Sequence, residues 1–383
     1  MPSSPKAGAS SHVRAGDVPD LMTALGRVPD PRARRGRRYP LAGLLAVAVS
    51  AVTAGAKSFT AIGEWAAALS TESLAGFGLQ TAPEASNLRK LFARVDGTAL
   101  DAALAVFTWM RVRNIGGRRV VAIDGKTVRG ARSATTAAPH LVAALDHVTG
   151  VVLGQGKVDA KSNEIPAVRD LLAGFDAADL HGCVITVDAM HTQTDTATAI
   201  TDAGADYVFT VKNNQPTLYA ALKALPWTKI PLGSQATQRG HGRRATRTIK
   251  VADAPAWIDF PGALQVAQVR RTVTTKDKSG KKHTSVEVAY LITSADHQAA
   301  PPAVLASWVQ GHWCIENRLH WIRDVTFDED RSQVRTRNSP HVMASLRNTA
   351  IGLLRLAGWD NIAAALRHHA RDPDRTAKWL LTC

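Results

Sequence analysis

RVVAIDG at residues 119–125 decides the fold, because an apolar run with three β-branched residues leads directly to an aspartate and a glycine. Such a run predicts a buried β-strand. HLVAALDHVTG at 140–150 and VVLGQGKVD at 151–159 have the same character, with a Thr-Gly turn between them. Together the three runs predict a hairpin or meander.

Helices and strands alternate after the meander. The segments are EIPAVRDLLAGF (164–175, helix), CVITVDA (183–189, strand), TDTATAITDAG (194–204, helix), DYVFTV (206–211, strand) and QPTLYAALKAL (215–225, helix). The order β-β-β-α-β-α-β-α predicts an α/β fold with a mixed sheet, in which an antiparallel meander precedes parallel crossovers. This is the ribonuclease-H-like order.

The flanking regions have other patterns. Residues 1–16 are small and polar, and apolar residues then recur at helical spacing through 17–117. Within 228–298, strand-like runs with basic turns interrupt the α/β alternation. We therefore expect a disordered tail at 1–16 and a small all-helical N-terminal domain at 17–117. We expect the α/β domain to cover 118–383, with a β-rich insertion at 228–298.

Composition limits the partners and the compartment. Among 383 residues the hydrophobic share of 45% allows a sizeable core, and the net charge of +15 implies an anionic partner. Nucleic acid, an anionic membrane and an acidic protein all remain possible on charge alone. Cys183, Cys314 and Cys383 lie far apart, which argues against a disulfide framework or a cysteine-rich zinc site and fits a reducing cytoplasm.

No segment near the start of the chain predicts a membrane span. The start of the chain is polar, so we expect no signal peptide. Residues 40–56 are apolar but fall short of the ~20 residues that a span needs, so a buried helix is expected there.

A cluster of arginines lies within the predicted helical domain. It is either a solvated basic loop or a phosphate-contacting arm, and the basic composition favours the arm. Its members are Arg32, Arg34, Arg35, Arg37 and Arg38.

Two aspartates follow predicted strands. Asp124 ends the 119–125 run and Asp188 ends CVITVDA. A carboxylate at the end of a central strand points into the crevice where open α/β sheets bind ligands. Either residue alone could be an ordinary turn or helix-capping aspartate. Their presence on neighbouring strands favours a shared site.

The third candidate carboxylate is Glu316, within SWVQGHWCIENRLHWIRDVTFDED (307–330). An apolar stripe predicts an amphipathic helix; it consists of Trp308, Ile315, Leu319 and Ile322. His312, Glu316, His320 and Arg323 follow on an adjacent face at spacings of 4, 4 and 3. A helical salt bridge to Arg323 is the ordinary alternative. Trp313 and Trp321 lead us to expect a built site instead of open surface.

Three carboxylates suit phosphodiester chemistry. Mg²⁺ prefers oxygen ligands and keeps several waters, so two or three carboxylates suffice. A pair of such ions about 3.5–4 Å apart can activate the attacking water and stabilise the leaving oxygen. The carboxylates would repel one another without cations.

The chain resembles the DDE transposases of bacterial insertion sequences, specifically the ISAs-type, H-repeat-associated group. The resemblance covers about residues 20–355 and lies in a set of motifs in the same order: VAIDGKTVRGA (121–131), VDAMHTQ (187–193), DYVFTVKNNQ (206–215), RGHGR (239–243) and HWCIENRLHWIRDVTFDEDRS (312–332). It implies that Asp124, Asp188 and Glu316 are the catalytic and metal-binding residues for two Mg²⁺ (or Mn²⁺) ions.

The resemblance also implies a reaction and its partners. Water would cleave the element's end and leave a 3′-OH, which would attack target DNA. The partners would be double-stranded DNA, as terminal inverted repeats and target, and a second copy in a homodimeric synaptic complex. We expect a cytoplasmic, nucleoid-associated bacterial protein without membrane contact. The residues expected to contact DNA are Lys126, Lys212, His312, Arg318, Arg323, Arg34, Arg35, Arg37, Arg38, Arg243 and Arg244.

Other functions remain open. His312, Glu316 and His320 could hold one zinc ion from a single helix in a hydrolase; such a site would keep zinc in an Asp124→Ala variant. A catalytically inactive, transposase-derived DNA-binding protein is the main alternative. A general nuclease would cut DNA without preferring the element's ends.

Overall fold

The computed structural model describes residues 19–112, 118–159, 163–240, 242–277 and 281–383. The predicted disordered tail, 1–16, lies outside these residues. The α-helices are α1 (Leu21–Leu25), α2 (Leu41–Thr53), α3 (Phe59–Ala67), α4 (Thr71–Gly76), α5 (Ala85–Phe92), α6 (Gly97–Val112), α7 (Glu164–Ala173), α8 (Ala177–Leu180), α9 (Thr194–Asp202), α10 (Pro216–Lys223), α11 (Pro302–His312), α12 (Ser339–Leu356), α13 (Ile362–His369) and α14 (Pro373–Leu381). The strands are β1 (Val120–Thr127), β2 (His140–Asp146), β3 (Val152–Lys157), β4 (Val184–Val187), β5 (Asp206–Val211), β6 (Ser234–Gly240), β7 (Arg243–Asp253), β8 (Gln265–Lys276) and β9 (Lys282–Thr293). Shorter helical turns are the 3₁₀ segments η2 (Arg34–Gly36), η3 (Arg129–Ala131), η4 (Ala189–His191) and η7 (Glu329–Arg331), and the π-helical segments η5 (Glu316–His320) and η6 (Ile322–Thr326).

The strands form one mixed sheet in the order β3-β2-β1-β4-β5-β9-β8-β7-β6. β1, β2 and β3 pair antiparallel, whereas β4 lies parallel to both β1 and β5. Helices α7 and α8 connect β3 to β4, and α9 connects β4 to β5. The predicted α/β class and the predicted meander followed by parallel crossovers are therefore confirmed.

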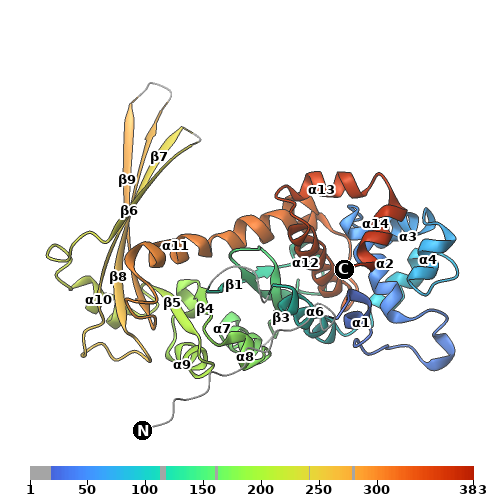
Figure 1. Ribbon diagram of the computed structural model, residues 1–383, viewed down its shortest axis with the longest axis horizontal. Coiled ribbons are helices and arrows are strands. Elements are labelled where there is room, and N and C mark those ends of the chain that lie inside the picture. Colours follow the sequence, from blue (N-terminus) through green and yellow to red (C-terminus); the bar gives the residue numbers. More distant parts are fainter. Residues whose placement is uncertain (1–18, 113–117, 160–162, 241, 278–280) are drawn as a thin grey trace, which may run out of the picture.

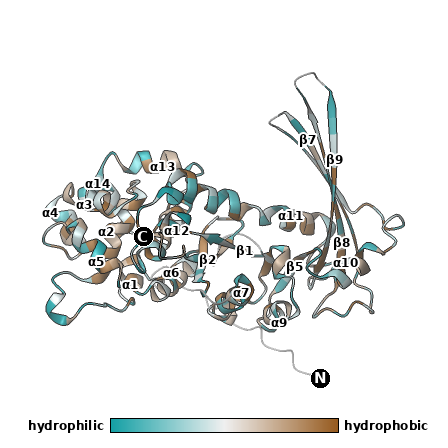
Figure 2. Ribbon diagram, turned by 180° about the vertical axis from the view of Figure 1, so that it is seen from behind, coloured by the Kyte–Doolittle hydropathy of each residue, from teal (hydrophilic) through white to brown (hydrophobic). Residues whose placement is uncertain are grey.

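Strands β6 to β9 occupy the region predicted to be β-rich, 228–298. They continue the same sheet, because β9 pairs antiparallel with β5. The long pairs β7–β8 and β8–β9 carry the sheet well beyond the helices, so that β7 and β9 project from the molecule as an arm (Figure 1). We call β6 to β9 the β-arm. Its projecting part is largely hydrophilic, as the teal colour on the outer ends of β7 and β9 indicates (Figure 2).

The remaining helices gather at the opposite end of the molecule. Helices α1 to α6 share one apolar core with α12, α13 and α14, so segments far apart in sequence lie side by side (Figure 1). Helix α2 is at the centre of this body, and all its residues except Ala42 are buried. Gly43 permits the close packing, since a Cβ there would lie 1.9 Å from the Phe77 carbonyl oxygen. The predicted buried helix at 40–56 is confirmed.

No helix in the described ranges is long and apolar enough to span a bilayer. The length of α2 follows instead from its role as the central helix of the helical body, where other helices cover it on several sides.

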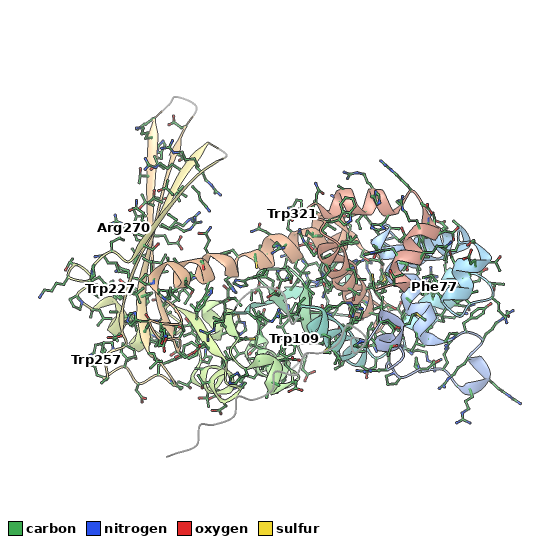
Figure 3. The ribbon with its side chains drawn as sticks, viewed as in Figure 1. Phe77, Trp109, Trp227, Trp257, Arg270 and Trp321 are labelled. Carbon is green, nitrogen blue, oxygen red and sulfur yellow. The ribbon has the colours of Figure 1, made fainter. Side chains whose placement is uncertain are left out.

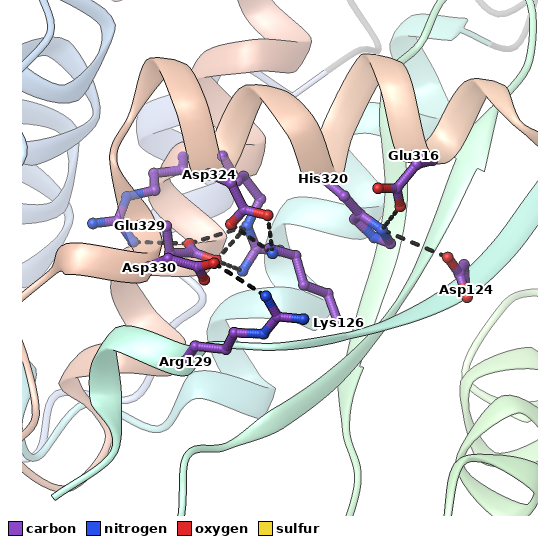
Figure 4. Close-up of polar contacts among 10 residues, drawn as sticks. Asp124, Lys126, Arg129, Glu316, His320, Asp324, Glu329 and Asp330 are labelled. Atoms are coloured by element: carbon purple, nitrogen blue, oxygen red, sulfur yellow. Dashed lines mark hydrogen bonds and ion pairs between the residues drawn. The ribbon is translucent and has the colours of Figure 1, made fainter.

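A buried ion triad joins the sheet side of the molecule to the helical body. Glu329 in η7 accepts hydrogen bonds from Arg323 in η6, at 2.7 and 3.0 Å, and from Arg347 in α12, at 2.8 Å. Burial alone would raise the pKa of Glu329, but the two guanidinium groups lower it to about 2. The triad therefore fixes the end of the helix that carries Glu316 against α12 (Figure 4).

We predict that Glu329→Gln destabilises the protein by about 3–5 kcal/mol, because it leaves two buried guanidinium groups without their counter-ion. Urea unfolding followed by circular dichroism measures the change. The exposed ion pair of Glu72 with Lys378 is the control, and Glu72→Gln should cost only a small fraction of that. Equal losses in the two variants would contradict the role given to the triad.

Candidate functional site

Asp124 lies within β1, which continues beyond the strand end predicted there to Thr127, and Asp188 is the first residue after β4, where the parallel pairing of the two strands stops. Ile123 pairs with Val187 across β1 and β4, and each aspartate is the next residue along the chain. Neighbouring strands are about 4.8 Å apart. The pairing therefore brings the two backbones together at one edge of the sheet, as the sequence predicts.

Glu316 comes from a helical segment that crosses this edge. The chain stays helical from α11 through η5 and η6, as Figure 4 shows for the part around the site. The predicted apolar stripe is confirmed, since all its members are buried; they are Trp308, Ile315, Leu319 and Ile322. The two π-helical segments were not predicted, because the spacing of apolar residues does not separate a π-helix from an α-helix. Such segments are frequent at functional sites.

The structure brings Asp124, Glu316 and His320 together. One potential ligand atom from each lies within 4.8 Å of the others. His320 Nδ1 is 3.2 Å from Glu316 Oε2 and 3.5 Å from Asp124 Oδ2 (Figure 4). Glu316 is exposed and His320 is buried, so the cluster opens to solvent on the glutamate side.

Asp188 is held by a second histidine. His312 Nε2 is 3.5 Å from Asp188 Oδ1, and His312 Nδ1 is 3.1 Å from the Thr186 hydroxyl. His312 thus contacts Asp188 while His320 contacts Asp124 and Glu316. The two histidines do not converge on Glu316, which removes the geometric basis for zinc held by His312, Glu316 and His320.

The electrostatics of the two aspartates differ. Burial, and then the charge of Asp188, raise the pKa of Asp124 to about 6. The hydrogen bond from His312 holds the pKa of Asp188 below its usual value despite burial. Burial lowers the pKa of His320 to about 3, so its imidazole is neutral and can act as a ligand or an acceptor. Asp124 therefore has unneutralised negative charge around it at neutral pH.

A second polar cluster lies on the opposite face of β1. His140 Nε2 is 2.5 Å and His191 Nε2 is 3.4 Å from the Glu164 carboxylate, whose pKa is lowered to about 2 by the His140 and His191 hydrogen bonds. Gly125 makes room for it, because a Cβ there would lie 2.5 Å from Glu164 Cδ. The sequence analysis missed this cluster. The only signal was the glycine directly after Asp124.

A cleft of about 430 Å³ opens beside Asp188. It lies between α11 and the inner part of the β-arm, and Lys212, Arg247 and Arg271 line it. Lys212, one of the residues predicted to contact DNA, is exposed. The cleft connects the carboxylate edge of the sheet to the β-arm.

Some of the residues predicted to contact DNA are exposed, and others have partners within the protein. The exposed ones are Lys212, Arg34, Arg35, Arg37, Arg38, Arg243 and Arg244. Arg32, next to this group, is held inward by Asp30 at 2.8 Å. Figure 3 shows Arg270 on β8, in the same β-arm as Arg243 and Arg244. His312, with 12% of its side chain exposed, stays beside Asp188.

Three of the residues predicted to contact DNA have partners within the protein. Arg323 is fully buried in the ion triad with Glu329. Lys126 is 8% exposed and its ammonium lies 2.6 Å from Asp324. Arg318 donates to the carbonyl oxygens of residues 147–149, at 2.7 to 3.1 Å. In each case the cationic side chain binds a partner within the protein, and sequence spacing does not reveal such a partner.

The two tryptophans also lie differently from the expectation. Trp313 is 63% and Trp321 is 54% exposed, so they do not enclose Glu316. Figure 3 shows Trp321 on the surface. They lie on the outer side of the helical segment, because the apolar stripe on its inner side takes the contacts with the core.

Comparisons with known proteins give a consistent family. Residues 115–353 match the family model described as "Transposase DDE domain", and residues 22–110 match the one described as "DDE_Tnp_1-associated". The chain is 32% identical over 356 residues to "Putative transposase YncI" of Escherichia coli O157:H7, covering 88% of each chain. It is 31% identical over 361 residues to "H repeat-associated putative transposase YhhI" of Escherichia coli (strain K12), covering 88% of this chain and 91% of the relative.

A solved structure was also found. The cryo-EM structure of the piggyBac transposase synaptic complex with hairpin DNA aligns with 94% of this chain and 78% of that chain, at a TM-score of 0.43 and 12% identity. The sequence relatives confirm the predicted resemblance to H-repeat-associated transposases.

We predict that Asp124→Asn stabilises the metal-free protein at about pH 7.5 by about 1–3 kcal/mol. The pKa of Asp124 is about 6 in the folded protein against a usual 3.8, so its charge costs folding energy above that interval. The contribution of the protonated Asp124 carboxyl group to the free energy of unfolding is fully present below pH 3.8 and is lost as the pH rises through 6. The gain should therefore vanish at about pH 3.5. Urea unfolding in EDTA measures it, and a variant that is less stable than wild type at about pH 7.5 would contradict the pKa assignment.

Proposed function

The chain belongs to the transposase DDE-domain family, and from this premise we propose that it cleaves the ends of an insertion sequence and joins them to target DNA. The proposed chemistry is phosphodiester hydrolysis followed by transesterification. Asp124, Asp188 and Glu316 are the proposed catalytic and metal-binding residues. The observation that carries the proposal is the convergence of Asp124 with Glu316, beside a second aspartate on the adjacent strand.

The donor set fits divalent cations. Two aspartates and a glutamate supply oxygen atoms, which Mg²⁺ and Mn²⁺ both accept. The raised pKa of Asp124 indicates negative charge that a cation would neutralise. Asp124 and Glu316 would hold one ion together, and Asp188 would contribute to a second one shared with Asp124. Such ions, when bound, would favour deprotonation of the attacking water or 3′-hydroxyl and stabilise the leaving oxygen.

The histidines orient the carboxylates in this proposal. His320 is neutral and lies between Asp124 and Glu316, so it can hold their spacing or serve as a further ligand. His312 bridges Thr186 and Asp188, which limits rotation of the Asp188 side chain. Glu164 reaches the same sheet edge from behind Gly125, where His140 and His191 contact its carboxylate.

DNA would bind along the cleft and the β-arm. Lys212 at the cleft and Arg243 and Arg244 on the β-arm are exposed cations that can contact phosphates. Arg34, Arg35, Arg37 and Arg38 form a second exposed group in the helical body. Each phosphate contact should add about 0.9 to the steepness of the salt dependence of binding.

The proposed domain organisation assigns catalysis and DNA association to different parts of the chain. Residues 118–383 would form a ribonuclease-H-like catalytic domain with the β-arm as its insertion, and 17–117 a DNA-associated helical domain. The strand order of β1 to β5 supports the ribonuclease-H-like assignment. We propose that two copies act together in the synaptic complex, because two ends must be cut.

We predict that Glu316→Gln abolishes strand cleavage, with a loss of about 10³-fold or more, because the ligand pair Asp124–Glu316 loses one charge. Binding to the element's ends should change less than about threefold. The measurements are cleavage of a labelled end fragment in Mg²⁺ or Mn²⁺ and a mobility assay on the same fragment. Glu64→Gln, an exposed glutamate of α3, is the matched control and should cleave like wild type.

Each outcome of this experiment separates the candidate functions. Cleavage that survives Glu316→Gln would contradict the proposed site. End binding by the wild type without cleavage under any divalent cation would favour the inactive, transposase-derived DNA-binding protein. Cleavage without preference for the element's ends would favour a general nuclease.

A further inference from the structure

We propose that a pocket between the helical body and the segment after η7 binds a phosphate group. The pocket has a volume of about 200 Å³ and lies where α3, α5 and α12 meet. We call it the helix-junction pocket; its polar lining includes Ser58, Arg89, Gln333, Arg335, Thr336 and Ser339. None of the functions assigned above uses it.

Two helices begin at the helix-junction pocket. Helix α3 begins at Phe59, after Ser58, and the 18-residue helix α12 begins at Ser339. Both first residues line the pocket. No side chain caps the start of α12. Most of the first N–H groups already have partners: the Ser58 hydroxyl accepts from the Ala61 N–H in α3, and in α12 the Ser339 N–H donates to the Thr336 carbonyl oxygen while Pro340 has no N–H. The dipole of each helix still gives this end partial positive charge, which favours an anion in the pocket.

Ser339 provides an independent indication of a ligand. Its side chain is fully buried, yet its hydroxyl has no hydrogen-bond partner within the described residues. A buried hydroxyl left unpaired costs roughly 1–3 kcal/mol, so native proteins rarely tolerate one without a partner. Because Ser339 also lines the helix-junction pocket, a bound oxygen atom would satisfy it.

The charges of the lining fit a phosphate. Arg89 and Arg335 contribute guanidinium groups, and the residues that line the pocket include no aspartate or glutamate. Arg335 uses Nε to donate to the Gly130 carbonyl oxygen at 3.0 Å, which leaves its terminal nitrogens for a ligand. Guanidinium groups bind phosphate oxygens in pairs. Hydroxyl and guanidinium donors without a competing acid therefore select a tetrahedral anion.

The ligand that fits this chain is a phosphate of the DNA backbone. Arg335 links the pocket to Gly130, shortly after β1 and Asp124, so a phosphate bound there would hold DNA between the helical body and the carboxylates. This identification of the source rests on the proposed function. Free inorganic phosphate has the same chemistry, and the experiment distinguishes the two.

The first arm measures inorganic phosphate. Calorimetric titration of the full chain at constant ionic strength should show binding, and Ser339→Ala should weaken it about tenfold, the worth of a hydrogen bond to a charged group. Since that hydroxyl makes no other bond, the variant should keep its melting temperature without phosphate. Arg89→Ala, an exposed position, tests the same pocket independently, and Arg367→Ala on α13 is the matched control. Binding equal in all four proteins, or none in any, would count against an inorganic phosphate site.

The second arm measures duplex DNA. If the site receives a backbone phosphate, Ser339→Ala and Arg89→Ala should each weaken binding, and Arg89→Ala should lower the slope of log K against log salt by about 0.9. Weaker inorganic phosphate binding with unchanged DNA binding would support the pocket and assign it to free phosphate. No effect in either arm overturns the proposal. Strand cleavage is not read in either arm, so failure of the proposed catalytic function would leave these results unaffected.

Discussion

The parallel pairing of β1 with β4 sets the constraint on which the site depends. It puts two carboxylates side by side, each one residue beyond the paired Ile123 and Val187, with Asp124 inside β1 and Asp188 directly after β4. Burial and mutual repulsion make this arrangement unfavourable, and the raised pKa of Asp124 is the direct consequence. The protein tolerates the cost locally, with His312 on Asp188 and neutral His320 beside Asp124. In the proposed function, a divalent cation neutralises this charge.

Glu316 can join the aspartates only if its helical segment is held across the sheet edge. Lys126 on β1 pairs with Asp324 on that segment, and Arg323 pairs with the buried Glu329 (Figure 4). Arg347 then ties Glu329 to α12 and so to the helical body. Cations near the site therefore serve two different purposes. Those on the inner face fix the helix, whereas Lys212 at the cleft and Arg243 and Arg244 on the β-arm are exposed.

The sequence was sufficient for the sheet and for the buried face of the helical segment that carries Glu316, because both depend on local patterns. Apolar runs of strand length gave β1, β4 and β5, and the stripe from Trp308 to Ile322 gave the buried face of the helix. It was not sufficient for partners that meet only in the folded chain. The sequence shows that Lys126, Arg318 and Arg323 are charged. Only the fold shows their partners, which are Asp324, the carbonyl oxygens of a backbone turn and Glu329, respectively. The Glu164 cluster behind Gly125 was missed for the same reason.

Crystals of the protein soaked with Mn²⁺ test the central claim most directly, because the anomalous signal of manganese locates the ion without reference to activity. The account predicts a peak within bonding distance of Asp124 and Glu316, with Asp188 bordering a second ion when DNA is present. Manganese bound at Glu164, His140 and His191 instead, or no peak at the sheet edge at saturating Mn²⁺, would contradict it.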